Sequence, residues 1–105
     1  MKAQIQLCVA IDEIFGNIAN YAYPNGGGRV TVQYLPLKDT AGVEITFIDS
    51  GVPFDPLAQK DPDITLSAEE RQIGGLGIHL VKKTMSDVRY SYLDGRNILT
   101  IKKIF

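Results

Sequence analysis

A glycine-rich segment at residues 74–77 is the part of the sequence best suited to bind a ligand. It reads Gly74-Gly75-Leu76-Gly77, and an apolar helical pattern begins within it. Backbone N–H groups at the start of a helix have no partner inside the helix and attract anions. Glycine also lets phosphate oxygens approach without a Cβ in the way. The segment therefore predicts a phosphate site. The alternative is a flexible loop and the start of a helix that bind no ligand.

Two polar side chains one turn apart form a second candidate group on the first expected helix. Glu13 and Asn17 share a helix face, which lies about 120° from the apolar stripe at about 100° per residue. An amide oxygen is a suitable ligand for Mg²⁺, which is normally shared with phosphates and waters. A carboxylate one turn away could take a proton from an attacking hydroxyl or water. The alternative is a polar helix face in contact with solvent.

A carboxylate followed by glycine ends the second expected strand. Asp49 can accept hydrogen bonds from an exocyclic amine such as that of adenine. Gly51 permits a flat base to lie against the backbone, and Val52 and Phe54 supply an apolar wall. The alternative is an Asp-Ser-Gly turn without a ligand.

The segment between this motif and the glycines has weak periodicity and is expected to be a mobile loop. Residues 67–70 resemble a short helix with a serine cap. The loop has a suitable length for a lid over a nucleotide. Arg71, just before the glycines, could meet the phosphates, and a solvated arginine is the equal alternative.

Hydrophobic periodicity assigns the remaining residues to helices and strands. Apolar residues recur at helical spacing over 4–22 and again over 77–85. The expected strands, which alternate apolar and polar residues, are 29–35, 43–48, 88–93 and 96–104. Asp94-Gly95 between the last two is a strong hairpin signal. Because strands joined by short links are antiparallel, helices should cover one face of a mixed sheet in an α/β sandwich of two layers.

Length and composition limit the possible classes of protein. The 105 residues correspond to a single domain, and the net charge of −1 with scattered basic residues gives no nucleic-acid footprint. The one cysteine, Cys8, excludes an internal disulfide and fits a reducing cytoplasm; its helical context predicts a packed side chain. No membrane span or signal peptide is visible. The abrupt start of the helical pattern suggests a domain cut from a longer chain.

The three groups, in this order, resemble the nucleotide-binding boxes of the GHKL, or Bergerat-fold, ATPases. The matching motifs are Glu13-x-x-x-Asn17, Asp49-x-Gly51 and Gly75-Leu76-Gly77. Residues 20–23, 49–56 and 74–82 look like those of the anti-sigma-factor serine kinases of partner-switching systems. The resemblance extends over residues 7–105.

The resemblance implies a Bergerat-type, mostly antiparallel sheet with helices on one face, and ATP and Mg²⁺ as cofactors. Glu13 would be the catalytic base, and Asn17 would be the Mg²⁺ ligand. Asp49 would hold the adenine amine, with Gly51 beside the base. Gly75 and Gly77 would contact the phosphates under a lid of about residues 56–73.

The resemblance also implies partners. Such kinases phosphorylate a serine or threonine of an anti-sigma-factor antagonist, alternatively sequester a sigma factor, and in relatives form dimers. A second hypothesis is a nucleotide-binding regulatory module that binds a partner without phosphorylating it. A third, a histidine-kinase catalytic domain, fits the short lid and the sequence Pro53-Phe54-Asp55-Pro56 less well.

Two departures from the family pattern are visible in the sequence. A further strand and helix normally precede the first motif, and nearly all of that region is missing here. The last strand also lacks the Gly-Thr pair that lies near the adenine in many relatives, and Asn97 is the candidate that could replace it.

Overall fold

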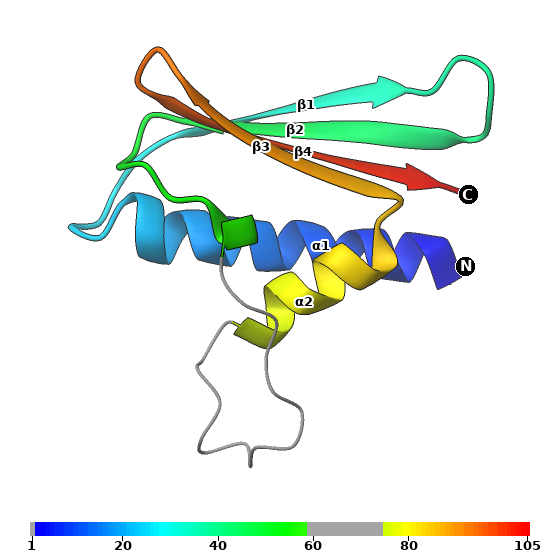
Figure 1. Cartoon of the computed structure of the whole chain (residues 1–105), viewed down its shortest axis with the longest axis horizontal. Coiled ribbons are helices and arrows are strands. Elements are labelled where there is room, and N and C mark those ends of the chain that lie inside the picture. Colours follow the sequence, from blue (N-terminus) through cyan, green and yellow to red (C-terminus); the bar gives the residue numbers. More distant parts are fainter. Residues whose placement is uncertain (1, 59–74) are drawn as a thin grey trace.

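The computed structural model of the chain describes residues 2–58 and 75–105, which form a sheet layer and a helix layer (Figure 1). The elements in chain order are α1 (Lys2–Asn17), η1 (Ile18–Ala22), β1 (Val30–Pro36), β2 (Gly42–Asp49), η2 (Pro56–Ala58), α2 (Gly75–Thr84), β3 (Asp87–Leu93) and β4 (Arg96–Ile104). Of these, η1 is a π-helix and η2 is a single 3₁₀ turn. The predicted order of helices and strands is confirmed.

The sheet has four strands in the order β1-β2-β4-β3, and every pairing among them is antiparallel. Strand β4 lies between β2 and β3, although β3 precedes it in the chain. Both helices lie on the same face of the sheet (Figure 1), so the predicted two-layer α/β sandwich is confirmed. In this register Asp49, the last residue of β2, lies opposite Asn97 near the start of β4.

The β3–β4 connection is the predicted hairpin. Asp94 and Gly95 have φ angles of 54° and 76°. A type I′ turn requires positive φ at both central residues, which Asp and Gly tolerate best. This turn fixes the register in which Tyr92 pairs with Asn97.

The core lies between the inner face of the sheet and the helix faces that oppose it. Its buried members are Ala10, Ile14, Ile45, Phe47, Val81, Met85, Leu99 and Ile101. The predicted apolar stripe of the first helix is confirmed, because Leu7, Ile11 and Ile18 pack against this cluster. Cys8 is exposed, so its predicted packed environment is wrong. It follows Leu7 directly and therefore points about 100° away from the stripe.

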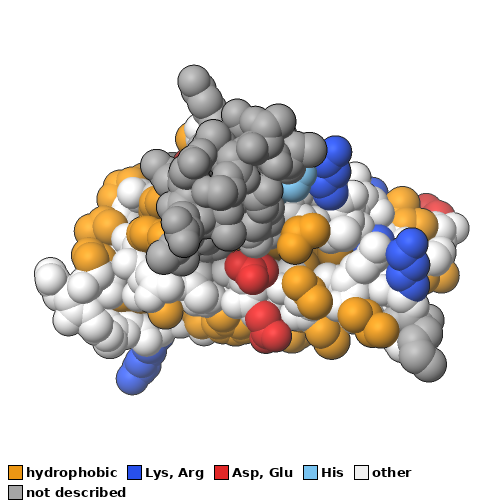
Figure 2. All heavy atoms as spheres, turned by 90° about the horizontal axis from the view of Figure 1, so that it is seen from below, with side chains coloured by type: hydrophobic (Ala, Val, Ile, Leu, Met, Phe, Trp, Pro, Cys, Tyr) orange, Lys and Arg blue, Asp and Glu red, His pale blue; other side chains and the backbone are white. Residues whose placement is uncertain are grey.

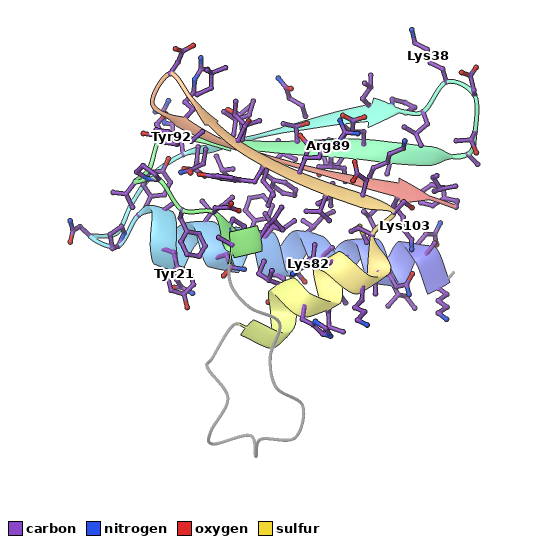
Figure 3. All side chains as sticks on the ribbon, viewed as in Figure 1. Tyr21, Lys38, Lys82, Arg89, Tyr92 and Lys103 are labelled. Carbon is purple, nitrogen blue, oxygen red and sulfur yellow. The ribbon has the colours of Figure 1, made fainter. Side chains whose placement is uncertain are left out.

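Lys103 joins the two layers at the end of the sandwich where β4 finishes. Its Nζ donates to Gln6 Oε1 of α1 at 2.8 Å and to the Thr84 carbonyl of α2 (Figure 3). Thr84 is the last residue of α2, and a cation at the C-terminal end of a helix stabilises carbonyls that have no intrahelical partner. The contact holds the end of α2 and the start of α1 on the same strand.

The helix-bearing face is not uniformly polar. Seen from below, hydrophobic side chains occur along its length, and acidic side chains lie near its middle (Figure 2). On α1, Ile5, Val9 and Phe15 are exposed. In the described part of the chain, neither helix has the length and apolar character needed to cross a bilayer.

Residue 51 is a glycine because the end of η1 packs directly against it. A Cβ on Gly51 would lie 2.2 Å from the Ala22 carbonyl oxygen. The same oxygen accepts a hydrogen bond from Val52 N at 2.9 Å. The segment after β2 is therefore fixed to the end of η1, which directly follows Asn17 at the end of α1.

Ile101 provides a test of the packed core, because its side chain is fully buried whereas that of Ile104 on the same strand is 45% exposed. We expect Ile101→Ala to lower the free energy of unfolding by about 2–5 kcal/mol, through lost burial and a cavity. Ile104→Ala should lower the free energy of unfolding by less than about 1 kcal/mol, because substitutions of exposed side chains have small effects on stability. Urea unfolding of both variants measures the difference, and equal losses would contradict the described packing.

Gly51 can be tested with a second glycine as its control. Gly51→Ala places a Cβ against backbone that cannot yield easily, so we expect a loss of stability of about 1–3 kcal/mol from overpacking. Gly16 lies in α1 with no atom within 4 Å of its added Cβ. Gly16→Ala should therefore be neutral or stabilise by up to about 1 kcal/mol, as expected for helix propensity. Thermal melting compares the two, and a Gly51→Ala variant as stable as Gly16→Ala would refute the contact.

Candidate functional site

A cavity lies between the helices and the end of the sheet where β2 finishes and β4 begins. Three predicted site residues line it, namely Asn17, Asp49 and Phe54. Tyr90 and Asn97 line it too, and most of the remaining wall is aliphatic. A mostly apolar cavity with a few converging polar groups is typical of a small-molecule site.

The free space in this cavity is small. Its volume of about 20 Å³ has room for little more than one water molecule. A purine ring could therefore enter only if wall residues move. Phe54 lies on the segment after β2, and its ring stacks on that of Tyr21 with ring centroids 4.8 Å apart and an angle of 19° between the ring planes.

Asp49 is the buried carboxylate of the site, with 3% of its surface exposed. Its Oδ1 accepts hydrogen bonds from Gly51 N at 2.9 Å and from Asn97 Nδ2 at 2.8 Å. No other hydrogen bond to the Asp49 carboxylate occurs within the described residues. Its second oxygen is thus left to accept a bond from a ligand amine, as an ionised carboxylate can only accept.

Asn97 lies on the inner face of the sheet opposite Asp49, and it is 4% exposed. Its Nδ2 donates to Asp49 and to the Val52 carbonyl at 2.9 Å. Its Oδ1 accepts from Phe54 N at 3.0 Å and from the Tyr90 hydroxyl. All the bonds needed to compensate burial of this amide are therefore made.

Tyr90 was not among the predicted site residues. Burial raises the pKa of its phenol above the ordinary value of 10.0, so at neutral pH the hydroxyl keeps its proton and donates to Asn97. The register of the β3–β4 hairpin could have identified Tyr90. Tyr92 pairs with Asn97, so Tyr90, two residues before Tyr92, is the diagonal neighbour of Asn97 on the same face of the sheet.

The first and third motifs meet at Gly77. A Cβ on Gly77 would lie 1.8 Å from Glu13 Oε2, so the carboxylate occupies the space that any other side chain would need. Gly77 is in the first turn of α2, where the helix dipole favours a negative charge. The structure therefore brings Glu13 to the helix start that the glycine segment forms.

Asn17 is buried, with 9% of its surface exposed, so the alternative of a solvated polar face does not hold for it. Its Nδ2 donates to the Glu13 carbonyl at 3.0 Å. Among the described residues its Oδ1 has no hydrogen-bond partner, which suits an oxygen-seeking ion such as Mg²⁺. No cluster of three or more His, Cys, Asp or Glu occurs in residues 2–58 and 75–105, so Mg²⁺ would depend on this amide together with phosphates and water.

The segment after β2 is held from behind by Tyr23. The Tyr23 hydroxyl accepts from Ser50 N at 2.9 Å and donates to the Arg29 carbonyl at 2.7 Å. Its ring lies 2.4 Å from where a Cβ of Gly28 would be, so the ring packs flat on that glycine. Tyr23 itself does not line the cavity of Asp49.

Some predicted site residues are not brought to the cavity by the described contacts. Val52 is exposed and contributes its carbonyl to Asn97. Gly51 contacts Ala22, and its proposed contact with a base stays a prediction. Gly75 and Leu76 begin α2. Arg71, Gly74, the short helix at 67–70 and the lid beyond residue 58 lie outside the described residues.

Comparison with known proteins is consistent with this arrangement. The family model of the histidine kinase-like ATPase domain matches residues 1–103. The serine-protein kinase RsbW of Listeria monocytogenes is 32% identical over 103 residues, which are 93% of this chain and 64% of that kinase. The serine/threonine-protein kinase BtrW of Bordetella bronchiseptica is 29% identical over 101 residues, or 95% of this chain and 70% of that kinase.

A third relative, the serine-protein kinase RsbW of Bacillus cereus, is 31% identical over 100 residues, or 91% of this chain and 61% of that kinase. The chain thus spans less than two thirds of the two RsbW kinases. No solved structure matches significantly. The family match covers nearly the whole sequence, and the four-stranded sheet with helices on one face agrees with it. This chain therefore belongs to the family of histidine kinase-like ATPase domains.

Proposed function

We propose that the chain binds ATP with Mg²⁺ and is the catalytic domain of a serine/threonine protein kinase of the anti-sigma-factor type. The observation that carries the proposal is the contact between Glu13 and Gly77. It joins a candidate base to a candidate phosphate site. Asp49 and Asn17 line the neighbouring cavity, so one ligand could reach all three motifs.

In this proposal each motif binds a different part of the nucleotide. The free oxygen of Asp49 accepts a hydrogen bond from the adenine amine, and Asn17 Oδ1 holds Mg²⁺. The backbone N–H groups at the start of α2, residues 75–77, bind phosphate oxygens. Bound Mg²⁺ would neutralise charge on the phosphates, and most of the catalysis of phosphoryl transfer comes from such neutralisation and positioning.

Glu13 is the proposed base that accepts the proton of the substrate hydroxyl. The relatives named above are serine or serine/threonine kinases, which supports a hydroxyl as the acceptor. The sequence resemblance supports an anti-sigma-factor antagonist as the protein substrate, a sigma factor as a second partner and a homodimer. The single cysteine, Cys8, supports a cytoplasmic location.

Thermal melting tests nucleotide binding. A ligand at 100 times its Kd that binds only the folded state adds about 2.7 kcal/mol of stability, which raises the Tm of a domain of this size by roughly 10 °C or more. We expect such a rise with ATP and Mg²⁺ and a much smaller one for Asp49→Asn. Asp39→Asn, the same change in the exposed β1–β2 loop, should respond like the wild type. No rise for the wild type at millimolar ATP would count against the site.

A phosphate-transfer assay tests the role of Glu13. Glu13→Gln keeps the side-chain size beside Gly77 and removes the base, so we expect ATP binding to persist while transfer to an antagonist protein falls by about 10²–10⁴-fold. Asp12→Asn, an exposed neighbour on α1, should transfer at the wild-type rate. Unchanged transfer by Glu13→Gln would exclude the base. A wild type that binds ATP and phosphorylates none of the antagonists encoded nearby would favour the regulatory module instead.

A further inference from the structure

We infer that Asn97, oriented by Tyr90, is a positioning residue that aims the Asp49 carboxylate and thereby makes the site selective for a purine with a 6-amino group. The inference rests on the proposed function, since it concerns how the nucleotide base would be recognised. It assigns a role to two residues, one on β4 and one on β3, that lie outside the three motifs.

The Asp49 carboxylate is restrained by two hydrogen bonds to one of its oxygens. Asp49 and Asn97 are directly opposite each other on β2 and β4, and their buried side chains are joined by a 2.8 Å hydrogen bond. Gly51 N donates to the same carboxylate oxygen at 2.9 Å. With two donors on Oδ1, the carboxylate cannot rotate without breaking both bonds. Oδ2 is therefore the oxygen presented to a ligand.

The Asn97 amide is itself restrained by four hydrogen bonds. Its Oδ1 accepts from Phe54 N and from the Tyr90 hydroxyl, and its Nδ2 faces Asp49 and the Val52 carbonyl. A flipped amide would place its N–H groups against two donors and its oxygen against a carboxylate. Only one orientation of the amide satisfies these four neighbours. Tyr90 thus helps to fix the end of the amide that faces Asp49.

Recognition of the base depends on the oxygen that Asp49 presents. An ionised carboxylate offers only acceptor positions, so Oδ2 can bind an amine and disfavours a carbonyl at the same place. The same Asn97 amide also holds Val52 and Phe54, whose segment forms part of the wall. Losing Asn97 would release both the carboxylate and this segment. Losing only the Tyr90 hydroxyl would loosen the amide and leave the tyrosine ring in place.

The test compares the Kd of ATP with that of purine riboside triphosphate, which lacks the 6-amino group, both measured with Mg²⁺ by titration calorimetry. A hydrogen bond to a charged group predicts that the wild-type chain binds ATP at least about tenfold more tightly. In Asn97→Ala we expect both affinities to fall, because the wall segment of Val52 and Phe54 is released, and we expect the affinity for ATP to fall further, so that the ratio drops below about threefold. Tyr90→Phe should lower the ratio by about threefold.

Two controls remove hydroxyl groups that make no hydrogen bond to Asn97 in the described part of the chain, although Tyr92 pairs with Asn97 across the strands. Thr100→Ala removes a hydroxyl that bonds to Thr46 on the opposite face of the sheet, and Tyr92→Phe removes the hydroxyl from the next inward tyrosine of β3. Both should keep the wild-type ratio.

Equal losses for the two nucleotides, or a ratio unchanged in Tyr90→Phe, would overturn the positioning role. If Asn97→Ala does not fold, Tyr90→Phe decides the question. A wild type that binds both nucleotides equally would overturn the inference and leave ATP binding standing. A wild type that binds neither would overturn the proposed function as well.

Discussion

The buried hydrogen bond between Asp49 and Asn97 is the interaction on which the rest of the site depends. A carboxylate and an amide removed from water cost several kcal/mol unless their bonds are replaced. Here the replacements come from β2, β3, β4 and the segment after β2 at once. The same bonds that make burial of Asp49 tolerable therefore also hold the cavity wall against the sheet. Hydrogen bonds are stronger in the low dielectric of the protein interior. For the same reason, a buried polar group that lost its partner here would lower the stability of the fold.

Strand β4 shows how this polar group coexists with a hydrophobic core. Its inward residues are Asn97, Leu99, Ile101 and Lys103. The two apolar residues in the middle pack under the helices, and the two polar residues bond to other elements at either end. Asn97 belongs to the ligand site, whereas Lys103 fastens the helices at the far end. One strand thus supplies both the centre of the core and the polar contacts that end it.

The sequence predicted the elements well because their spacing directly reflects burial. The helical stripe of α1, the alternating strands and the Asp94-Gly95 turn all follow from local patterns, and so did the candidates Glu13, Asn17 and Asp49. The network around Asn97 could not be predicted in this way, because Asp49 and Asn97 are 48 positions apart and meet only through the sheet register. Glycine is required at position 51 because Ala22 lies against it. A short motif could not reveal this contact, because the two residues are far apart in the sequence. Cys8 was misjudged because its apolar character says nothing about the side of the helix on which it lies.

Tyr23 illustrates how a residue behind a site can be mistaken for part of it. Its hydroxyl connects Ser50 to Arg29, and its ring covers Gly28, yet it is absent from the cavity wall. Tyr23 supports the backbone between Asp49 and Val52. A substitution of Tyr23 would therefore affect ligand binding indirectly. A mutational scan scored only by activity would rank Tyr23 with the ligand contacts, and only a structure separates the scaffold from the surface that it supports.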